Sequence, residues 1–250
     1  MKRIFCTLVL SLLVLGHLYG QPENQAREII KKVDQLYRSR SSRAEIEMSI
    51  TTPNWQRTLS IAAWSKGTDR TFIIINQPKK EKGTATLRIG NEMWNYLPAT
   101  DKVIKIPPSM MMGSWMGSDF NNDDLVKESS LLEDYTYRII VPETPVTGEV
   151  YVEMIPKKDA VIVWGKVILV VRDKDYLPLR QEHYDEKGAL MRVMTFSAIK
   201  PMGGKTIPTV MDLVPRNKPG NRTVITYKRI EFDLPLRDDI FSQRNLKKGN

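Results

Sequence analysis

The sequence predicts a mainly β protein, built on one large, strongly curved antiparallel sheet with one or two helices. About a dozen segments either alternate apolar and polar residues or are rich in β-branched residues, and turn residues separate them. One stretch near the start has the three-and-four apolar spacing of a helix. The composition, with 41% hydrophobic and 27% charged residues, is ordinary for a chain that builds a core.

The first 20 residues have the pattern of a secretory signal peptide. Lys2 and Arg3 form a basic start, an apolar run of about 12 residues follows, and the segment ends at the small residue Gly20. We expect cleavage after Gly20 and a single domain over residues 21–250. The apolar run is too short to span a bilayer, which takes roughly 20 residues. Cys6, the single cysteine, lies near the start of that run, so neither a lipid anchor nor a disulfide is expected.

The expected elements begin with an amphipathic helix whose apolar stripe consists of Ala26, Ile29, Ile30, Val33, Leu36 and Tyr37. Next, Ala44, Ile46, Met48 and Ile50 alternate with polar residues, which predicts a half-buried strand. Further strands are expected at residues 57–66, 70–76, 84–89, 93–97, 102–106, 135–141, 148–155, 161–172, 177–185, 190–199, 206–213 and 222–233. Gly203 and Gly204 indicate a hairpin turn between two of these strands.

One expected strand has no polar alternation. Val167 to Val171 is a continuous apolar run, so both of its faces must be covered. One helix of about 15 residues cannot cover the apolar concave face of so large a sheet. A second helix or a ligand must fill the rest. A membrane β-barrel is not expected, because charges fall on both faces of strands such as Tyr227 to Glu231.

The segment from Ile106 to Leu125 has an unusual composition. It contains four methionines and two aromatic residues, while Pro107, Pro108 and two Gly-Ser pairs disfavour a long regular element. We expect a loop that leads into a short helix capped near Asn121 to Asp123. Two interpretations stay open: the methionines plug the core of the sheet, or the segment is a movable lid over an apolar pocket.

Several short motifs then occur in an order that resembles a known family. They are Gly117-Ser118-Asp119-Phe120, Asp123-Asp124-Leu125, Asp175-Tyr176-Leu177-Pro178 with Arg180, the turn Asp185 to Gly188, Ile207-Pro208, Thr223, Ile230, Phe241 and, upstream, Trp94 to Pro98. In this order they are similar to the periplasmic outer-membrane lipoprotein-sorting proteins, the LolA-like carriers of lipids and lipoproteins. The resemblance covers most of the chain after residue 20.

The resemblance implies a half-open antiparallel barrel, with an N-terminal helix and a short lid helix over an apolar cavity that shields acyl chains in the periplasm. The expected cargo is a lipid or an acylated lipoprotein. The expected partners are an inner-membrane transporter, of ABC or RND type, and an outer-membrane acceptor. The family's lid-holding arginine is placed at Arg70. The residues expected to line the cavity are Trp64, Phe72, Ile74, Trp94, Tyr96, Met110, Met111, Met112, Trp115, Met116, Phe120 and Leu125.

Groups for catalysis or metal binding are not expected. His183 is the one histidine after residue 20, and we expect it at the surface or in a cross-strand position. The spacing of Asp119, Asp123 and Asp124 does not fit a calcium loop. The sequence therefore predicts neither an enzyme nor a bound cofactor.

The formal net charge of +9 favours anionic partners and falls by two when Lys2 and Arg3 are removed. The basic residues are scattered through turns and form no nucleic-acid motif, so nucleic acid is not an expected partner. Solvation and attraction to anionic lipids both explain the charge. Two functions remain open: a carrier with a cavity, or an envelope interaction module or accessory transporter subunit whose sheet is filled by its own side chains.

Overall fold

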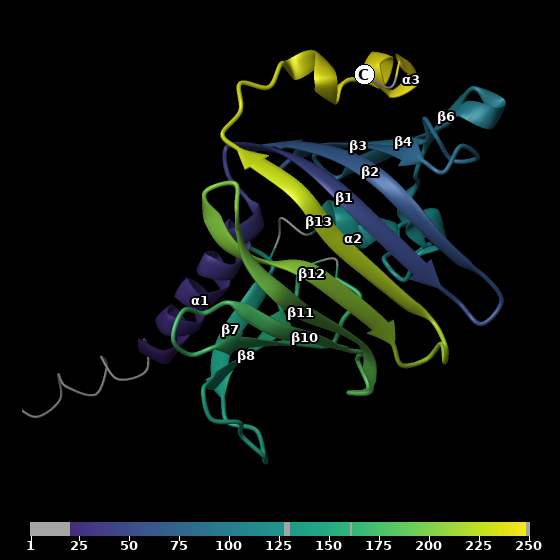
Figure 1. Cartoon of the computed structure of the whole chain (residues 1–250). Coiled ribbons are helices and arrows are strands. Elements are labelled where there is room, and N and C mark those ends of the chain that lie inside the picture. Colours follow the sequence, from purple (N-terminus) through teal and green to yellow (C-terminus); the bar gives the residue numbers. More distant parts are fainter. Residues whose placement is uncertain (1–20, 128–130, 161, 249–250) are drawn as a thin grey trace, which may run out of the picture.

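The chain folds around one antiparallel sheet of 13 strands that curves strongly but does not close (Figure 1). The computed structural model describes residues 21–127, 131–160 and 162–248. Across the sheet the strands follow the order β6-β5-β4-β3-β2-β1-β13-β12-β11-β10-β9-β8-β7. The predicted fold class is therefore confirmed. Within the described residues no helix is both long enough and apolar enough to span a membrane.

The strand bounds follow the predicted segments closely. They are β1 (Ser41–Thr51), β2 (Gln56–Lys66), β3 (Arg70–Gln77), β4 (Ala85–Ile89), β5 (Glu92–Leu97), β6 (Lys102–Lys105), β7 (Tyr135–Ile140), β8 (Glu149–Pro156), β9 (Lys166–Arg172), β10 (Pro178–Tyr184), β11 (Leu190–Met202), β12 (Lys205–Pro215) and β13 (Arg222–Phe232). Three α-helices, α1 (Gln21–Tyr37), α2 (Asn122–Lys127) and α3 (Gln243–Lys248), complete the described fold.

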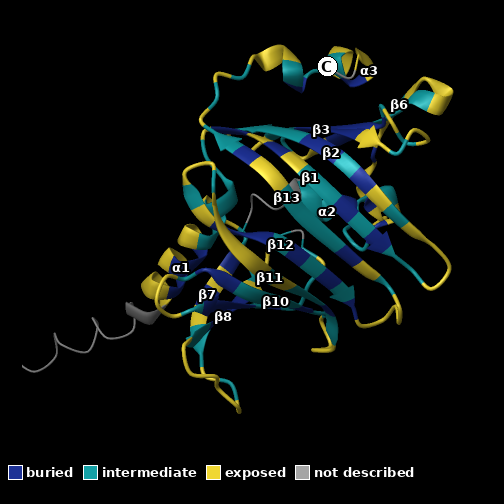
Figure 2. Cartoon of the chain, viewed as in Figure 1, coloured by how far each residue is buried: buried dark blue, intermediate teal, exposed yellow. Residues whose placement is uncertain are grey.

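Alternation along the strands separates the two faces of the sheet (Figure 2). On β1, Ala44 and Met48 are buried on the concave side, whereas Arg43 and Glu45 are exposed on the other. Gly203 and Gly204 form the β11–β12 turn with φ values of 60° and 82°, as predicted for this hairpin. In β9, Val170 and Val171 are both fully buried, so this strand is covered on both faces, as its apolar run indicated.

Helix α1 covers one end of the concave face. Its buried residues Ala26, Ile29 and Ile30 pack against side chains of β7, β8 and β9. At its C-terminal end, the Tyr37 hydroxyl donates to the Pro208 carbonyl at 2.6 Å, and the ring stacks on Tyr227 with centroids 5.4 Å apart. The helix thus closes the β7–β9 end and reaches the middle of the sheet.

The C-terminal segment covers part of the convex face, an element that the sequence did not reveal. Phe241 and Leu246 pack against Phe72, Leu87 and Trp94 of β3, β4 and β5, and the ribbon of Figure 1 shows the C-terminal segment beside these strands. The segment is also tied to the sheet electrostatically, because Asp238 accepts hydrogen bonds from Lys66 at 2.7 Å and from Arg70 at 2.9 Å.

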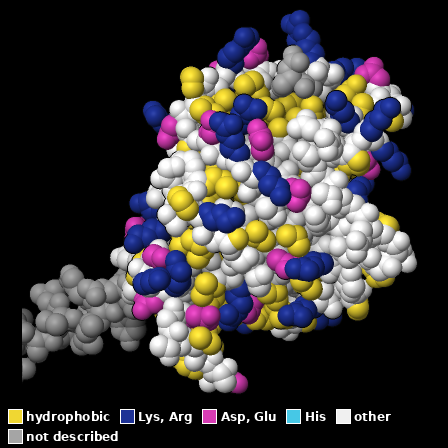
Figure 3. Space-filling view, in the orientation of Figure 1, with side chains coloured by type: hydrophobic (Ala, Val, Ile, Leu, Met, Phe, Trp, Pro, Cys, Tyr) yellow, Lys and Arg dark blue, Asp and Glu magenta, His cyan; other side chains and the backbone are white. Residues whose placement is uncertain are grey.

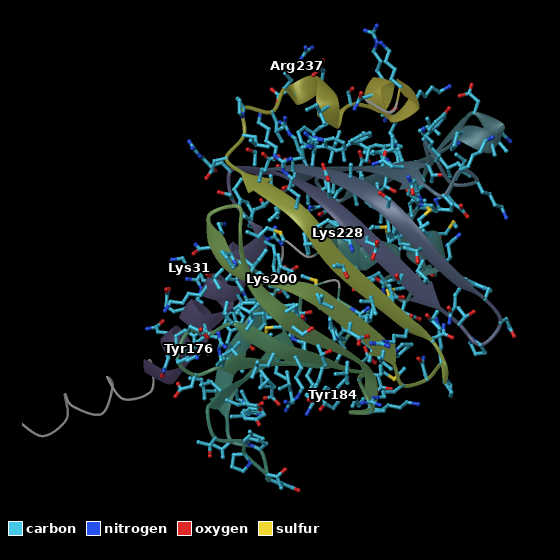
Figure 4. The ribbon with its side chains drawn as sticks, in the orientation of Figure 1. Lys31, Tyr176, Tyr184, Lys200, Lys228 and Arg237 are labelled. Atoms are coloured by element: carbon cyan, nitrogen blue, oxygen red, sulfur yellow. The ribbon has the colours of Figure 1, made fainter. Side chains whose placement is uncertain are left out.

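Charges of both signs are interspersed on the face shown in Figure 3. Lys200 and Lys228 project outward from β11 and β13 (Figure 4), and Lys228 lies 3.1 Å from Glu47. Basic and acidic side chains therefore share this surface, which is the arrangement expected for solvation.

Candidate functional site

A cavity of about 330 Å³ lies between the concave face, helix α1 and the segment Trp115–Leu125. Its wall includes residues from β1, β2, β3 and β4 on one side and from β10, β11, β12 and β13 on the other. The cavity therefore extends across the junction of β1 and β13, where strands β1–β6 meet strands β7–β13. Its size is at the lower end of the range of about 300–1,000 Å³ that is typical of ligand pockets.

The middle of the cavity is apolar. Ala44, Ala63 and Ile73 are cross-strand neighbours on β1, β2 and β3, and all three face the cavity. The opposite half of the sheet contributes Met194, Phe196, Met211, Leu213 and Ile225. Polar side chains also line the cavity. Ser42, Ser65, Thr71 and Arg88 lie at one margin, Gln181, His183 and Arg192 at another, and α1, α2 and β13 add further polar groups, among them Tyr37, Asp123 and Tyr227. Such a cavity suits an apolar chain with a polar end.

Helix α2 lies over the cavity and begins with a reciprocal cap. The Asn121 side-chain oxygen accepts from the Asp124 amide at 2.7 Å, and the Asp124 carboxylate accepts from the Asn121 amide at 2.8 Å. This confirms the short helix predicted after the methionine-rich loop, with its cap where the sequence placed it.

A buried ion pair connects α2 to the sheet. Arg192 on β11 donates to both carboxylate oxygens of Asp124, at 2.6 and 2.8 Å. The arginine side chain is 9% exposed and the carboxylate 17% exposed, so little water screens this bidentate pair. Arg70, expected to hold the lid, instead bonds Asp238 on the convex side. The prediction for Arg70 was wrong because it follows a sharp turn whose side-chain direction the sequence does not specify.

His183 lies beside this ion pair, buried and directly opposite Arg192 of β11, so the predicted cross-strand position is confirmed and the alternative surface position is wrong. Its ring meets Trp164 edge-on with centroids 4.9 Å apart, and the Arg192 guanidinium lies 4.5 Å from the centre of the Trp164 ring. The Arg192 Nη2 lies 3.3 Å from His183 Nε2. Because a guanidinium can only donate, Nε2 accepts and the ring proton is assigned to Nδ1. Burial, aided by the Arg192 charge, holds the pKa of His183 well below its ordinary value.

Comparison with known proteins identifies the family. A family model described as "Uncharacterized protein" matches residues 67–248. The chain belongs to this family. No curated protein sequence matches the chain.

Solved structures relate the family's fold to known proteins. A DUF1329 family protein from Desulfovibrio piger is 28% identical, with a TM-score of 0.80 over 90% of this chain and 99% of that one. A putative outer membrane lipoprotein-sorting protein domain from Vibrio parahaemolyticus is 25% identical, with a TM-score of 0.76 over 90% and 99%. A LolA superfamily protein from Nitrosomonas europaea, 21% identical over 88% and 98%, has a TM-score of 0.73. The resemblance to lipoprotein-sorting proteins and the LolA-like fold are thereby confirmed.

The motif residues of this family member have local structural roles. The Asp119 carboxylate accepts from the Thr223 hydroxyl at 2.8 Å and from the Asn221 amide at 3.2 Å. The Asp119 amide donates back to the Thr223 hydroxyl at 3.0 Å. Two motifs more than 100 residues apart thus fasten the segment from Ile106 to Leu125, the methionine-rich segment, to the start of β13. Asp175 pairs with Arg172 in the β9–β10 turn at 2.6 Å.

Three of the residues expected to line the cavity do so with their side chains. Trp115, Phe120 and Leu125 border it, and Trp115 is buried, with its indole nitrogen donating to the Thr86 hydroxyl at 3.0 Å. Trp64 belongs to the same strand wall, but its ring packs on Phe72 with centroids 5.6 Å apart. The Trp64 ring therefore lies on the convex side.

The other expected lining residues of β3 and β5 lie outside the cavity. Phe72, Ile74, Trp94 and Tyr96 belong to the cluster under the C-terminal segment. Their neighbours Ile73 and Ile75 pack instead with the methionine-rich segment on the concave side. We expected Phe72 and Ile74 to face the concave side, but Ile73 and Ile75 do so instead. The sequence does not distinguish the two sets because β3 is apolar on both faces.

The four methionines of the segment divide into two pairs. Met111 and Met116 pack against the concave core, whereas Met110 is 54% exposed and Met112 is 46% exposed. Arg57 also holds the segment by donating to the Met116 carbonyl. Sequence reasoning missed Arg192 and the polar margin residues. The signal for the margin was present, since polar residues replace apolar ones at the inward positions at one end of β1, β2 and β3.

Proposed function

We propose that the protein is a periplasmic carrier that holds an acyl chain of a lipid or lipoprotein in the cavity between the sheet and α2. The observation that carries this proposal is the apolar middle of the cavity. The fold that forms this cavity is also that of a lipoprotein-sorting protein domain and of a LolA superfamily protein. The signal-like first 20 residues, which lie outside the described residues, support export.

The energetics of transfer support a cavity of this kind. Removing each CH2 group from water gives about 0.8 kcal/mol, so a long acyl chain needs a continuous apolar wall rather than a few surface residues. Ala44, Ala63 and Ile73 on one half of the sheet, and Met194 and Phe196 on the other, provide such a wall. A chain lying across them would be shielded on its outer side by Trp115, Phe120 and Leu125.

The placement of α2 suggests how cargo enters. The helix is joined to β11 by the Arg192–Asp124 pair and to β13 through Asp119 and Thr223. Both connections are polar, and the Arg192–Asp124 pair lines the cavity, so α2 can move when they break without unfolding the sheet. An inner-membrane transporter, of ABC or RND type, and an outer-membrane acceptor would load and unload such a carrier.

A matched pair of substitutions on β11 tests the proposal. Met194 lines the cavity, whereas Ser197 is exposed three residues later. A fluorescent C16 acyl probe should bind the wild-type protein and Ser197→Glu alike, and Met194→Glu should bind it at least tenfold more weakly. The reason is that an unpaired charge in an apolar cavity costs several kcal/mol, of which about 1.4 kcal/mol corresponds to tenfold. Normal binding by folded Met194→Glu would contradict the proposal.

A second candidate function is supported by the exposed Met110 and Met112. Flexible thioether side chains at a surface suit contact with a protein partner. An accessory subunit of an inner-membrane transporter would use these two residues and leave the cavity unused. Met110→Ser combined with Met112→Ser would then abolish transporter contact, while the acyl probe would fail to bind even the wild-type protein.

A further inference from the structure

Three turns lie at the same end of the sheet. They join β1 to β2 (residues 52–55), β3 to β4 (residues 78–84) and β12 to β13 (residues 216–221). The strands are antiparallel and β13 begins where β1 ends, with Arg222 opposite Thr51, so the three turns leave the sheet in the same direction. The Pro53 ring lies beside Gly220, 3.0 Å from where a Cβ would stand. Figure 1 accordingly shows the β1–β2 and β12–β13 turns side by side.

An exposed tryptophan lies at the middle of the three turns. Trp55 is 42% exposed, and its turn stands between the other two in the strand order. The ring lies 3.6 Å from where a Cβ of Gly117 would stand, so it packs beside the methionine-rich segment. Arg57 supports this contact, because its guanidinium lies 5.2 Å from the centre of the Trp55 ring and donates to the Met116 carbonyl. The ring is thus held in place while much of it stays in water.

The methionine-rich segment extends this apolar surface with Met110 and Met112, which are both exposed. The Asn121 amide donates to the Met112 sulfur at 3.9 Å, and Asn121 forms a β-bridge with Ser114. The Ser114 hydroxyl donates to the Ser118 carbonyl. These contacts fold residues 112–121 into a compact loop that carries Gly117 against the Trp55 ring. The tryptophan and the two methionines therefore belong to one surface.

Basic residues flank this apolar surface on both sides. Five exposed cations come from the β3–β4 and β12–β13 turns, namely Lys79, Lys80, Lys82, Arg216 and Lys218. In the part of the chain that the structure describes, none of the five pairs with a carboxylate. The single acidic residue of the three turns, Glu81, is neutralised by Arg57 at 3.0 Å. The surface is therefore apolar at its centre and positive on either side.

We propose that this surface, made of the three turns and the exposed methionines, docks on a phospholipid membrane that carries anionic headgroups. A tryptophan ring is stable at the headgroup level, where one side is apolar and the other wet. Lysine side chains beside it keep their stems in the apolar layer and place their ammonium groups among the headgroups. Anionic lipids attract such clusters of basic residues. Charge and apolar surface thus match the same partner.

The docking surface lies next to the cavity. Trp115 and Phe120 of the methionine-rich segment line the cavity, whereas Met110 and Met112 of the same segment are exposed. A membrane bound at the docking surface would contact the segment that covers the cavity. The proposal itself concerns only the surface, and it stands whether or not the cavity binds an acyl chain.

Sedimentation with phospholipid vesicles tests the proposal without any acyl probe. The protein should bind vesicles of phosphatidylglycerol and phosphatidylcholine in equal amounts at least tenfold more tightly than vesicles of phosphatidylcholine alone. High salt should remove most of that difference, because it screens exposed charges. Equal binding to the two kinds of vesicle would overturn the proposal. Absence of binding to either would also overturn it and would leave an acidic protein as the partner that fits the cations.

Two triple variants of equal charge change locate the binding surface. Serine at each of the three lysines of the β3–β4 turn should weaken binding to the anionic vesicles at least tenfold, because each basic residue near an anionic membrane contributes about fivefold. The control places serine at three exposed lysines elsewhere, Lys31 of α1, Lys174 of the β9–β10 turn and Lys200 of β11, of which Lys31 and Lys200 are labelled in Figure 4. It should lose far less affinity. Equal losses in the two variants would indicate attraction by net charge alone and would overturn the proposal.

Trp55→Phe tests contact with the lipid directly and does not depend on how the lysine variants fold. Vesicles with brominated acyl chains should quench the fluorescence of the bound wild-type protein more strongly than that of bound Trp55→Phe, because bromine quenches only nearby indole rings. Equal fractional quenching of the two proteins would show that Trp55 does not reach the membrane and would overturn the proposal. None of these results bears on the acyl probe titration, so failure of the docking surface leaves the carrier function untouched.

Discussion

At the scale of single residues, the Arg192–Asp124 pair is the contact that most directly holds α2 over the cavity. The sequence indicated that Asp124 lies near a helix cap, and the structure confirms it. The sequence could not indicate its partner, because Arg192 is 68 residues away and any of 38 basic residues could have filled that role. Long-range ion pairs leave no periodic pattern, which is also why the place of Arg70 was predicted wrongly.

Breaking this pair should destabilise the fold. Asp124→Asn or Arg192→Met is expected to lower the free energy of unfolding by about 3–5 kcal/mol, because the remaining charge stays buried without its partner. Urea unfolding measures this loss. The double variant should lose less than the two single variants summed, since neither charge remains. A loss below about 1 kcal/mol in both single variants would show that the pair behaves as a surface ion pair.

His183 should give the fold a defined pH dependence. Its pKa in the folded state is depressed, so between that value and its unfolded pKa, about 6.5, only the unfolded chain takes up the proton. Stability is therefore unaffected above pH 6.5 and falls as the pH drops below it, by about 1.4 kcal/mol per pH unit from this residue. Burial and the neighbouring Arg192 charge cause this low pKa of His183 in the folded state.

His183→Gln isolates that contribution. The free energy of unfolding is measured from pH 7.5 to 5 for both proteins. Below pH 6.5 it should fall with pH less steeply in the variant than in the wild type, by about 1.4 kcal/mol per pH unit. Identical slopes for the two proteins would contradict a buried neutral histidine.

At the scale of elements, strand positions could be predicted but the faces of some strands could not. Alternation in β1 identifies its inward side, because Glu45 cannot be buried without a partner while Ala44 can. In β3 both parities are apolar, since Phe72 and Ile74 face the C-terminal segment and Ile73 and Ile75 the methionine-rich segment. Only the packing of these two distant segments decides which parity lines the cavity.

The C-terminal segment should stabilise the fold without touching the ligand. Leu246 is fully buried against the convex cluster, so Leu246→Ala is expected to cost about 2–5 kcal/mol of unfolding free energy. The folded variant should bind an acyl probe with unchanged affinity. Thermal or urea unfolding together with a probe titration measures both effects. If folded Leu246→Ala bound the probe much more weakly than the wild-type protein, the convex cluster that contains Phe72 and Trp94 would have to be part of the binding site.

Ligand binding should slow amide hydrogen exchange in the methionine-rich segment. Met110 and Met112 are exposed, whereas Trp115 is buried and hydrogen-bonded to Thr86. We expect amides of residues 110–116 to exchange hydrogen faster in the free protein than in the presence of an acyl ligand. Equal and strong protection in both states would instead assign the whole segment to the fixed core.

At the scale of the whole molecule, the sequence indicated more concave apolar surface than one helix can cover. The structure fills that surface from two ends, with α1 over β7–β9 and the methionine-rich segment over β1–β3, and a cavity is left between them. A sequence indicates which residues are apolar but not how completely their side chains fill a space. The existence of the cavity therefore became visible only in the assembled fold, although the LolA-like resemblance predicted it.

The affinity of a homologous series of alkyl phosphates tests the carrier account most directly. If the chain enters the cavity, each added CH2 from C6 upward should lower the dissociation constant about fourfold, which corresponds to 0.8 kcal/mol, until the cavity is full and the affinity levels off. Met194→Glu should show no such gain. An affinity that does not depend on chain length, or the same gain in Met194→Glu as in the wild-type protein, would contradict binding in the cavity.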